Sequence, residues 1–347
     1  MKGNKTVTVK DIADLAGVSP ATVSLVLNND QRISEATRNK VKRALKELNY
    51  SLNGVAQSLR TKKSRIIGLI VPSITNPFYP EIASGVEETA EKAKYSVLLC
   101  NSLNNPRREE YYINLLLEKR ADGIIFTTYL EDADYSPMNK QTHTKALSLV
   151  LNPQLEIADF LLVDQIKGSY EAVTYLISLG HTKIAYIGRQ SSRIKGYHQA
   201  LRDHNLSPDP ELCLYLNEPF ISSSGEHFVE LGHSMIRDLL QKRPDTTGIF
   251  AFNDMLALGA INAAKELGLR IPDDLSIIGY DDNPYARISD PPLTTVKQPK
   301  YERGTAAVHL LLERLKNSIS ESVQTVYPAE LIIRKSVKAI SNNGSSI

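Results

Sequence analysis

The sequence predicts a small all-α head followed by a two-lobed α/β core built on parallel sheets. Helix caps and a glycine turn divide residues 8–48 into three short helices. From residue 66 onward, apolar runs of strand length alternate with helical patterns, which is typical of parallel sheets with crossover helices. The charge changes sign at the same place. Residues 1–65 hold 13 Lys and Arg against 5 Asp and Glu, whereas residues 66–347 hold 28 against 34.

The composition is that of an ordinary globular protein. With 347 residues, 42% of them hydrophobic and 23% charged, the chain is long enough for a small domain plus a large one. Its two cysteines, Cys100 and Cys213, provide no disulfide framework and fit a reduced compartment. No run approaches the roughly 18 apolar residues of a membrane span, and residues 1–5 lead into no apolar signal core. We therefore expect a cytoplasmic protein with no membrane partner.

The head, residues 1–50, begins with two helices joined by a tight turn. Thr8 and Asp11 have the spacing of a capping box, and Gly17 ends the first helix. Ser19 caps the second helix and Pro20 suits its first turn. A third helix follows the cap at Ser34, with an apolar stripe formed by Val41, Ala44, Leu45 and Leu48.

This arrangement is a helix-turn-helix, which places the start of its second helix in the major groove of DNA. The local positive charge favours a polyanionic partner for the head alone. Small residues at the start of the second helix allow the backbone to approach DNA, and nearby hydroxyl and amide groups can donate to phosphates. The candidate DNA contacts in the head are Thr8, Ser19, Pro20, Ala21, Thr22, Ser24, Leu25, Asn28 and Thr37.

The core, residues 65–340, reads as alternating strands and helices. Its first strand, at residues 66–72, is a continuous apolar run that ends at a proline, as expected of a buried parallel strand. Further strands are predicted at 96–100, 123–126, 146–149, 161–163, 184–187, 248–252 and 275–278. Helices are predicted near 79–94, 107–119, 166–179, 194–204, 235–241 and 256–267. About ten strands are more than a single sheet usually contains, which predicts two lobes.

Polar and aromatic residues follow several of these strands. Ligands of parallel sheets bind outside the carboxyl ends of the strands. Aromatic faces combined with carboxylate, amide and guanidinium groups suit a polyhydroxylated ring. The candidate ligand-binding residues at these strand ends are Phe78, Tyr79, Tyr129, Arg193, Asn253 and Asp281.

Long segments of the chain resemble the LacI/GalR family of repressors. In the head these are residues 9–28, 34–41 and 53–60. In the core they are 179–188, 252–260, 275–282 and 292–299. The resemblance covers roughly residues 6–338, and its motifs are specific. It implies a transcription regulator, most simply a repressor, that binds a pseudo-palindromic operator as a homodimer and answers to a small-molecule effector, a sugar or sugar derivative.

The resemblance also implies roles for particular segments. Residues 51–64 match a hinge helix and linker. The segment 53–60 matches the hinge helix itself, which binds the minor groove, where Leu59 wedges between base pairs; the matching contacts are Asn53, Ala56, Gln57 and Leu59. The core resembles a periplasmic sugar-binding protein with the effector between its lobes. We expect lobe 1 at about 65–162 and 293–324, and lobe 2 at about 163–292 and 325–340. Arg193, Asp281 and Phe220 match effector-site positions, and residues 341–347 form a flexible tail.

Three departures from the family pattern concern specificity. Leu25 stands where many relatives carry a polar base reader, so the operator differs from the commonest consensus at these bases. Leu151 stands where many sugar-binding relatives carry Asp. An insertion of about seven residues near 225–232, close to two helical turns, extends a helix beside the position of Phe220 and so could reshape effector access.

Other functions are possible for parts of this sequence. A global catabolite-type regulator controlled by a phosphorylated carrier protein fits the same architecture. A solute-binding transport component would leave the DNA-reading head unexplained. The chain carries no phosphate-binding GxxxxGK[ST] loop, no HExxH and no GxSxG motif. We therefore expect neither an enzyme nor a cofactor or metal site. The sequence does not give the sign of the effector's action on DNA binding.

Overall fold

The computed structural model describes residues 7–27, 30–48, 63–128, 130, 132–140, 143–156, 158–216, 224–317 and 321–340. It divides into two compact units, Met1–Ser64 and Arg65–Ile347. Among the described residues, no helix is both long and apolar enough to cross a membrane, and no cluster of His, Cys, Asp and Glu in those ranges could hold a metal ion. Several predicted contacts lie outside the described residues, together with the tail: Asn28, Asn53, Ala56, Gln57, Leu59, Tyr129 and Phe220.

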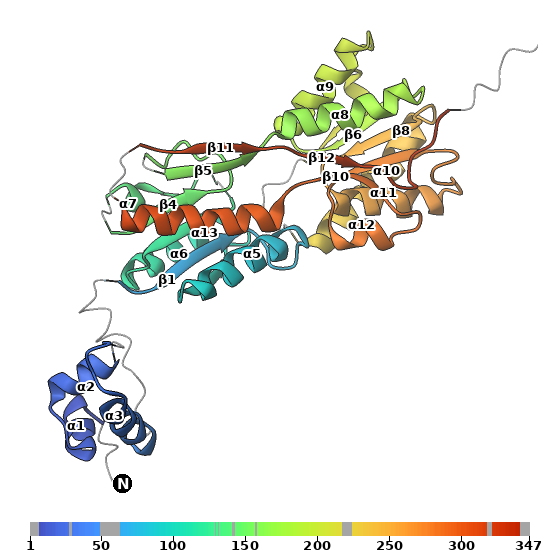
Figure 1. Ribbon diagram of the computed structural model, residues 1–347. Helices are drawn as coiled ribbons and strands as arrows, with labels where there is room; N and C mark the ends of the chain where they lie inside the picture. Colours follow the sequence, from blue (N-terminus) through green and yellow to red (C-terminus); the bar gives the residue numbers. More distant parts are fainter. Residues whose placement is uncertain are drawn as a thin grey trace, which may run out of the picture. The chain divides into compact units, whose positions relative to one another are not determined.

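The head contains the three predicted helices, α1 (Val9–Ala16), α2 (Pro20–Leu27) and α3 (Glu35–Glu47) (Figure 1). The capping box at Thr8 is confirmed, and so is the left-handed C-cap at Gly17, whose φ of 65° favours glycine. The caps at Ser19 and Ser34 are also confirmed. The three helices share one small apolar core, made by Ile12, Ala13, Ala16, Val23, Val26, Val41 and Ala44.

Lobe 1 is built on a six-stranded sheet with the order β11-β5-β4-β3-β1-β2, in which every pairing is parallel. Its strands are β1 (Ile66–Val71), β2 (Ser96–Asn101), β3 (Gly123–Phe126), β4 (Lys145–Ser148), β5 (Ala158–Val163) and β11 (Gln324–Tyr327). The predicted first strand is almost wholly buried. By contrast, β2 lies at the edge and leaves Leu98 and Leu99 exposed.

Helices cover both faces of this sheet. On one face lie α5 (Phe78–Lys92) and α13 (Lys300–Lys316), which pack side chains such as Ile82 and Val308 against β1. On the other face lie α6 (Pro106–Glu118) and the short α7 (Ser136–Asn139). A sheet covered on both sides needs apolar residues on both faces of each strand, which explains the unbroken apolar run of β1.

Lobe 2 repeats this architecture with the strand order β12-β10-β9-β8-β6-β7. All its pairings are parallel except that of β12 with β10. The strands are β6 (Ile184–Gly188), β7 (Cys213–Tyr215), β8 (Gly248–Ala251), β9 (Ser276–Asp281), β10 (Thr294–Lys297) and β12 (Glu330–Ile332). The 3-10 turn η1 (Pro210–Leu212) precedes β7, and α12 (Pro284–Ile288) follows β9.

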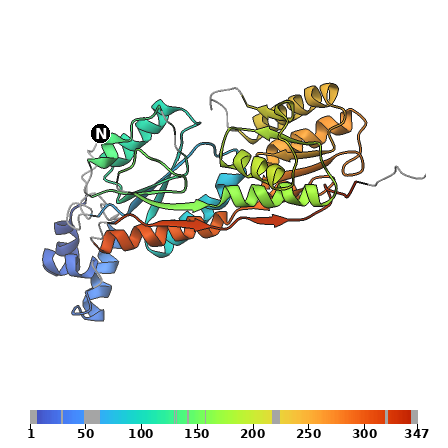
Figure 2. The ribbon, with the colours of Figure 1, turned by 90° about the horizontal axis from the view of Figure 1, so that it is seen from above.

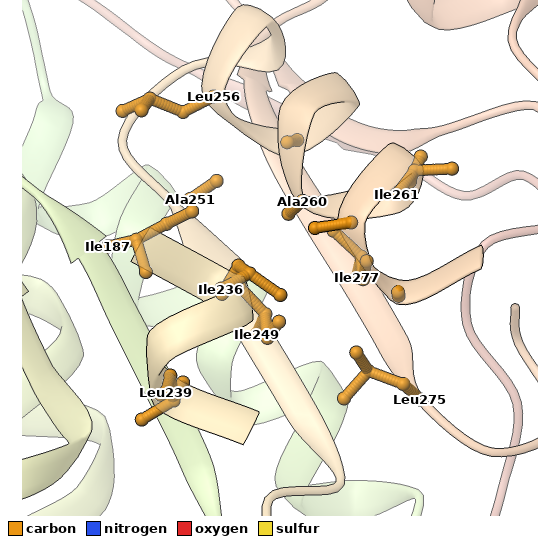
Figure 3. Close-up of a cluster of buried hydrophobic side chains, with 14 of the residues drawn as sticks. Ile187, Ile236, Leu239, Ile249, Ala251, Leu256, Ala260, Ile261, Leu275 and Ile277 are labelled. Atoms are coloured by element: carbon orange, nitrogen blue, oxygen red, sulfur yellow. The ribbon is translucent and has the colours of Figure 1, made fainter. Parts of the chain in front are cut away.

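The helices of lobe 2 also form two layers. α8 (Gln165–Ser178) and α9 (Ser192–Asp203) cover one face, and α10 (Gly225–Lys242) and α11 (Asp254–Glu266) cover the other. Figure 3 shows the second of these layers, where Ile236 and Leu239 of α10 and Ala260 of α11 face Ile249 and Ile277 of the sheet. The segment near 225–232 forms the first two turns of α10, which is one continuous helix.

The chain passes between the lobes three times, and two of the expected boundaries need correction (Figure 2). We expected residues 293–324 in lobe 1, but Thr294–Lys297 pairs with β9 and β12 of lobe 2. We expected residues from 325 in lobe 2, but Gln324–Tyr327 pairs with β5 of lobe 1. The physical reason is packing, since Val296 is buried in the core of lobe 2 while Tyr327 packs against that of lobe 1.

Candidate functional site

The helix N-termini of the head present hydroxyl groups at the surface. The Thr8 hydroxyl lies 2.6 Å from the Asp11 carboxylate. The Thr22 amide donates to the Ser19 hydroxyl at 3.1 Å, and these two hydroxyls lie 2.9 Å apart. The hydroxyls of Ser34 and Thr37 form a similar pair, also 2.9 Å apart. Free N–H groups at helix N-termini favour negative charge, so these positions suit contact with phosphates.

The predicted DNA contacts that the structure describes lie on the accessible side of the head. Thr8, Ser19, Pro20 and Ala21 are exposed, and Thr22, Ser24, Leu25 and Thr37 are partly exposed. Their accessibility follows from α2, which turns Val23 and Val26 inward to the apolar core. Within the described part of the head, therefore, none of the candidate contacts is buried.

An ion pair orders the loop between α2 and α3. Asp30 accepts from the Arg32 guanidinium at 2.7 Å, and Arg38 donates to the Asp30 carbonyl at 2.9 Å. Hydrogen bonds from the Arg32 side chain and backbone lower the pKa of the partly exposed Asp30 carboxyl to about 2. Because Arg32 is exposed and Asp30 is partly exposed, this pair contributes little to stability.

A cavity of about 610 Å³ lies between the two lobes of the core. We refer to it as the interlobe cavity. It collects residues at or shortly after the carboxyl ends of strands from both sheets, as expected for parallel sheets. Lobe 1 contributes Asn76, Asn104, Thr127 and Leu149, and lobe 2 contributes Gln165, Arg189, Leu216, Phe252, Asp281 and Gln298.

Five of the seven predicted effector contacts line this cavity: Phe78, Tyr79, Arg193, Asn253 and Asp281. The other two lie outside the described residues. Leu151 lines the cavity as well, as does Phe228 from the first turn of α10. Asn253 also caps α11, because its side chain accepts from the Leu256 amide at 2.8 Å.

Arg193 is held in a fixed position at the start of α9. Its guanidinium donates to Gln165 at 3.1 Å and to the Phe252 carbonyl, and it lies 3.5 Å from the Asp281 carboxylate. The same group lies over two rings, at 3.9 Å from the centre of Tyr280 and 4.3 Å from that of Phe252. A planar guanidinium combines such stacking with directed hydrogen bonds. These contacts therefore fix the positively charged group of Arg193 at the wall of the cavity.

Asp281 sits at the end of β9 in an unusual backbone conformation, with φ of 113° followed by φ of 49° at Asp282. Both values lie in the region that favours glycine, so the local backbone is strained. The buried Lys300 stabilises it, because its ammonium donates to the carbonyls of Asp281 at 2.6 Å and Asp282 at 3.0 Å. The ammonium also lies 3.1 Å from Glu81 of α5, in lobe 1.

Two buried carboxyl groups next to the cavity have raised pKa values. Burial raises the pKa of Asp254 to about 8, and the nearby Asp281 adds to this. Asp254 accepts hydrogen bonds from Thr295 and from the Asn283 amide. Burial also raises the pKa of Asp281, whereas Arg193 lowers it. Asp254 is therefore largely protonated at neutral pH, and the positive charge of Arg193 favours the ionised form of Asp281.

Sequence reasoning missed several residues of the cavity. Arg189 and Phe252 lie at or just after the ends of predicted strands, so the rule that found Asp281 could have found them, whereas Gln298 follows β10, which was not predicted. Arg303 also lines the cavity, from the first turn of α13. No local pattern marks Arg303, because it is a single charged residue inside a helix that the sequence analysis did not predict.

Comparison with known proteins agrees with this architecture. Residues 8–53 match the family model "Bacterial regulatory proteins, lacI family", and residues 173–337 match the "Periplasmic binding protein-like domain". The chain is 38% identical to the HTH-type transcriptional regulator DegA of Bacillus subtilis (strain 168), over 96% of this chain and 99% of DegA. It is 36% identical to the HTH-type transcriptional repressor PurR of Aliivibrio salmonicida (strain LFI1238), over 95% and 98% of the two chains.

Among solved structures, the lac repressor dimer bound to operator and the anti-inducer ONPF has a TM-score of 0.83 and 29% identity, with 96% of this chain and 100% of that chain covered. These relatives are regulators of transcription and not enzymes. The predicted helix-turn-helix head and two-lobed parallel core are confirmed. The chain therefore belongs to the LacI family of bacterial regulatory proteins, and it is a DNA-binding transcription regulator under the control of a small molecule.

Proposed function

We propose that this regulator is a repressor that binds a pseudo-palindromic operator as a homodimer, and that a sugar or sugar derivative in the interlobe cavity sets its operator affinity. The observation that carries the proposal is the combination, in one chain, of an accessible helix-turn-helix with a cavity at the strand ends of both lobes. If the ligand and the operator each bind one arrangement of the lobes more tightly, then binding of the ligand changes the affinity for the operator. Binding of the operator changes the affinity for the ligand by the same factor.

The proposed DNA contacts divide by groove. The first turn of α2, from Pro20 to Ser24, enters the major groove, and the hydroxyls of Thr8, Ser19, Thr22 and Thr37 hold phosphates. Leu25 offers apolar contact to a base, for instance to a thymine methyl. The hinge residues Asn53, Ala56, Gln57 and Leu59 are assigned to the minor groove on the family resemblance alone.

The chemistry of the interlobe cavity supports a sugar-like effector. Phe78 and Tyr79 form an edge-to-face pair with ring centres 5.0 Å apart, and Phe252 adds a third ring. The same cavity is lined by the polar groups of Asn253, Asp281 and Arg193. Rings that stack on the faces of a sugar, and polar groups that bind its hydroxyls, are the usual means of recognising polyhydroxylated molecules.

The proposed homodimer uses the exposed edge of lobe 1. A groove of about 370 Å³ runs between β2 and α5, and Ile74, Pro80, Ala83, Val97 and Leu99 line it. We call this surface the β2 groove. Long apolar edge strands are a liability unless another chain covers them. A second copy of this chain is the proposed occupant, in line with the dimeric state of the lac repressor structure.

The proposed DNA binding is tested with operators that the full-length chain selects from a random library. Affinity is expected to fall steeply with salt, because bound phosphates release counterions. Leu25→Gln is expected to change the preferred base at one position of each half-site while the salt slope stays the same. An identical selected sequence for both proteins would contradict the role of Leu25.

The substitution Leu59→Ala tests whether the Leu59 side chain inserts between base pairs. The variant is expected to lower specific affinity and to reduce the bend of the operator, measured by energy transfer between dyes at the two DNA ends. Its affinity for unrelated DNA should remain close to that of the natural chain, because phosphate contacts dominate that binding. An unchanged bend would refute the assignment of Leu59.

A further inference from the structure

The segment that follows β4 lines the interlobe cavity with three consecutive apolar residues, Leu149, Val150 and Leu151. We call these three residues the apolar wall. Leu149 is buried and Val150 is partly exposed, whereas Leu151 is 60% exposed. Single exposed leucines are common on protein surfaces. Leu151 differs from them because it lies at a cavity, where a bound molecule can cover its side chain.

Hydrogen bonds hold the apolar wall in place. The Leu149 amide donates to the Phe126 carbonyl at 2.8 Å, and the Leu149 carbonyl accepts from the Arg303 guanidinium. The Val150 carbonyl accepts from the Ser148 hydroxyl at 2.6 Å, and the Val150 amide donates to the same hydroxyl at 3.3 Å. Because the peptide groups of both residues are satisfied within the protein, these residues present apolar side chains to a ligand.

The apolar wall continues into the aromatic pair of α5. Leu149 is part of the buried apolar cluster of lobe 1, and Phe78 and Tyr79 pack against that cluster. All three residues line the interlobe cavity. A ligand that lies against the two rings can therefore extend onto the apolar wall without leaving an apolar surface.

Polar groups from lobe 2 line the same cavity and are linked to one another. The Gln298 side chain donates to Oδ1 of Asp281 at 2.7 Å, and the Arg193 guanidinium lies 3.5 Å from the same oxygen. Arg193 also donates to Gln165 at 3.1 Å. We call these four residues the polar set. Carboxylate, amide and guanidinium groups held in this way suit the hydroxyl groups of a sugar.

Tyr79 lies close to both surfaces. It packs against the apolar cluster that contains Leu149. Burial raises the pKa of its hydroxyl, and the charge of the nearby Asp281 carboxylate adds to this effect. The cavity volume of about 610 Å³ falls within the range of roughly 300–1,000 Å³ that is usual for drug-sized ligands. The cavity therefore has room for a second group beside one sugar ring.

We propose that the effector is a glycoside, whose sugar hydroxyls bind the polar set and whose apolar aglycone covers Leu151 of the apolar wall. This inference rests on the proposed function of the interlobe cavity as the effector site, and it narrows the effector to a sugar with an apolar substituent. Removing apolar surface from water is favourable. A free sugar has no apolar group of this kind with which to cover Leu151.

The test compares matched ligands on the full-length chain by isothermal titration calorimetry at several temperatures. The pairs are methyl and phenyl β-D-glucopyranoside, and methyl and phenyl β-D-galactopyranoside. In at least one pair the phenyl glycoside is expected to bind about ten or more times tighter than the methyl glycoside, because it covers more apolar surface. Its binding should also show the more negative change in heat capacity, which is the signature of apolar burial.

Substitutions of Leu151 locate the preference. Leu151→Asn is expected to lower the ratio of phenyl to methyl affinity to about two, because it removes apolar surface from the wall. Leu151→Met, which stays apolar and similar in volume, is expected to retain most of the ratio. Leu267→Asn is the matched control, because Leu267 is 42% exposed and ends α11 at the opposite end from Asn253. Circular dichroism and the melting temperature of each unliganded variant establish that it folds.

Three results would overturn the inference: phenyl glycosides that bind no tighter than their methyl partners, a panel in which no glycoside binds, or a Leu151→Asn protein with an unchanged affinity ratio. Failure of the proposed function gives a different result. If the same preparation binds selected DNA and a free sugar alters that binding, then the regulator function stands and only the aglycone is wrong. If no DNA is bound, the proposed function itself fails.

Discussion

Replacing Leu99 by glutamate tests the proposed homodimer at the most exposed large apolar residue of β2. Half of the Leu99 side chain is exposed in the isolated chain, and it lines the β2 groove. A two-fold dimer uses the same patch on both subunits. Every substitution in the β2 groove therefore acts twice per dimer.

The expected magnitude follows from the exposed fraction. Burying a whole leucine side chain is worth about 1.5–3 kcal/mol, so covering the exposed half contributes about 1 kcal/mol per subunit and about 2 kcal/mol per dimer. Leu99→Ala should thus raise the dimer Kd by about thirtyfold. Leu99→Glu also buries two carboxylates without partners, at several kcal/mol each, so its Kd should rise at least about a thousandfold.

Sedimentation equilibrium over a range of chain concentrations measures both constants. Val326→Glu is the matched control, because Val326 is 53% exposed on β11, the opposite edge strand of the same sheet. Its Kd should equal that of the natural chain. Circular dichroism checks that all variants fold. A Leu99→Glu protein that dimerises as tightly as the control would refute the placement of the interface at the β2 groove.

Three further substitutions test the packing and electrostatics of the core. Burial raises the pKa of Glu109 to about 7, so the folded chain keeps a proton that the unfolded chain releases above its ordinary pKa of 4.5. The free energy of unfolding should therefore fall as the pH rises from about 4.5 to about 7, and Glu109→Gln should reduce that fall when it is measured by urea unfolding. An unchanged pH dependence would contradict the raised pKa of Glu109. Gly259→Ala would place a methyl group 2.0 Å from the Val229 carbonyl oxygen in α10. It should cost about 1–3 kcal/mol and lower the Tm by several degrees, and an unaltered Tm would contradict the close packing of α10 and α11. Arg314→Ala removes both hydrogen bonds of 2.6 and 2.8 Å to the buried Asp159 and should cost about 3–5 kcal/mol in urea unfolding. A loss below about 1 kcal/mol would show that water reaches the stranded carboxylate.

The elements that the sequence predicts well are those with local signals. The caps at Thr8, Ser19 and Ser34 depend on contacts three residues apart, so their spacing alone defines them. The buried run of β1 likewise needs no information from distant residues, because each of its side chains faces an apolar layer. The strand-end rule then located five contacts of the interlobe cavity, since parallel strands bring their carboxyl ends together.

The features that the sequence did not reveal depend on distant partners. β11 is four residues long and mostly exposed, and it is a strand only because β5 offers hydrogen bonds to its backbone. The prediction of lobe 1 and lobe 2 boundaries failed at β10 and β11 for the same reason. Arg303 lines the cavity because of the face that α13 turns toward the sheet of lobe 1. That orientation depends on the packing of the whole helix and cannot be predicted from Arg303 alone.

The ammonium of Lys300 has a mechanical consequence. An ammonium carries three protons, and here three acceptors surround it: the carbonyls of Asp281 and Asp282 in lobe 2, and the Glu81 carboxylate in lobe 1. All three protons of the Lys300 ammonium therefore have an acceptor, and the side chain connects the two lobes. Because Lys300 begins α13, which packs with α5 in lobe 1, a rotation of lobe 2 away from these helices removes the two carbonyl acceptors of Asp281 and Asp282 from a buried charge. We therefore expect the Lys300 contacts to favour the angle between the lobes that is seen here.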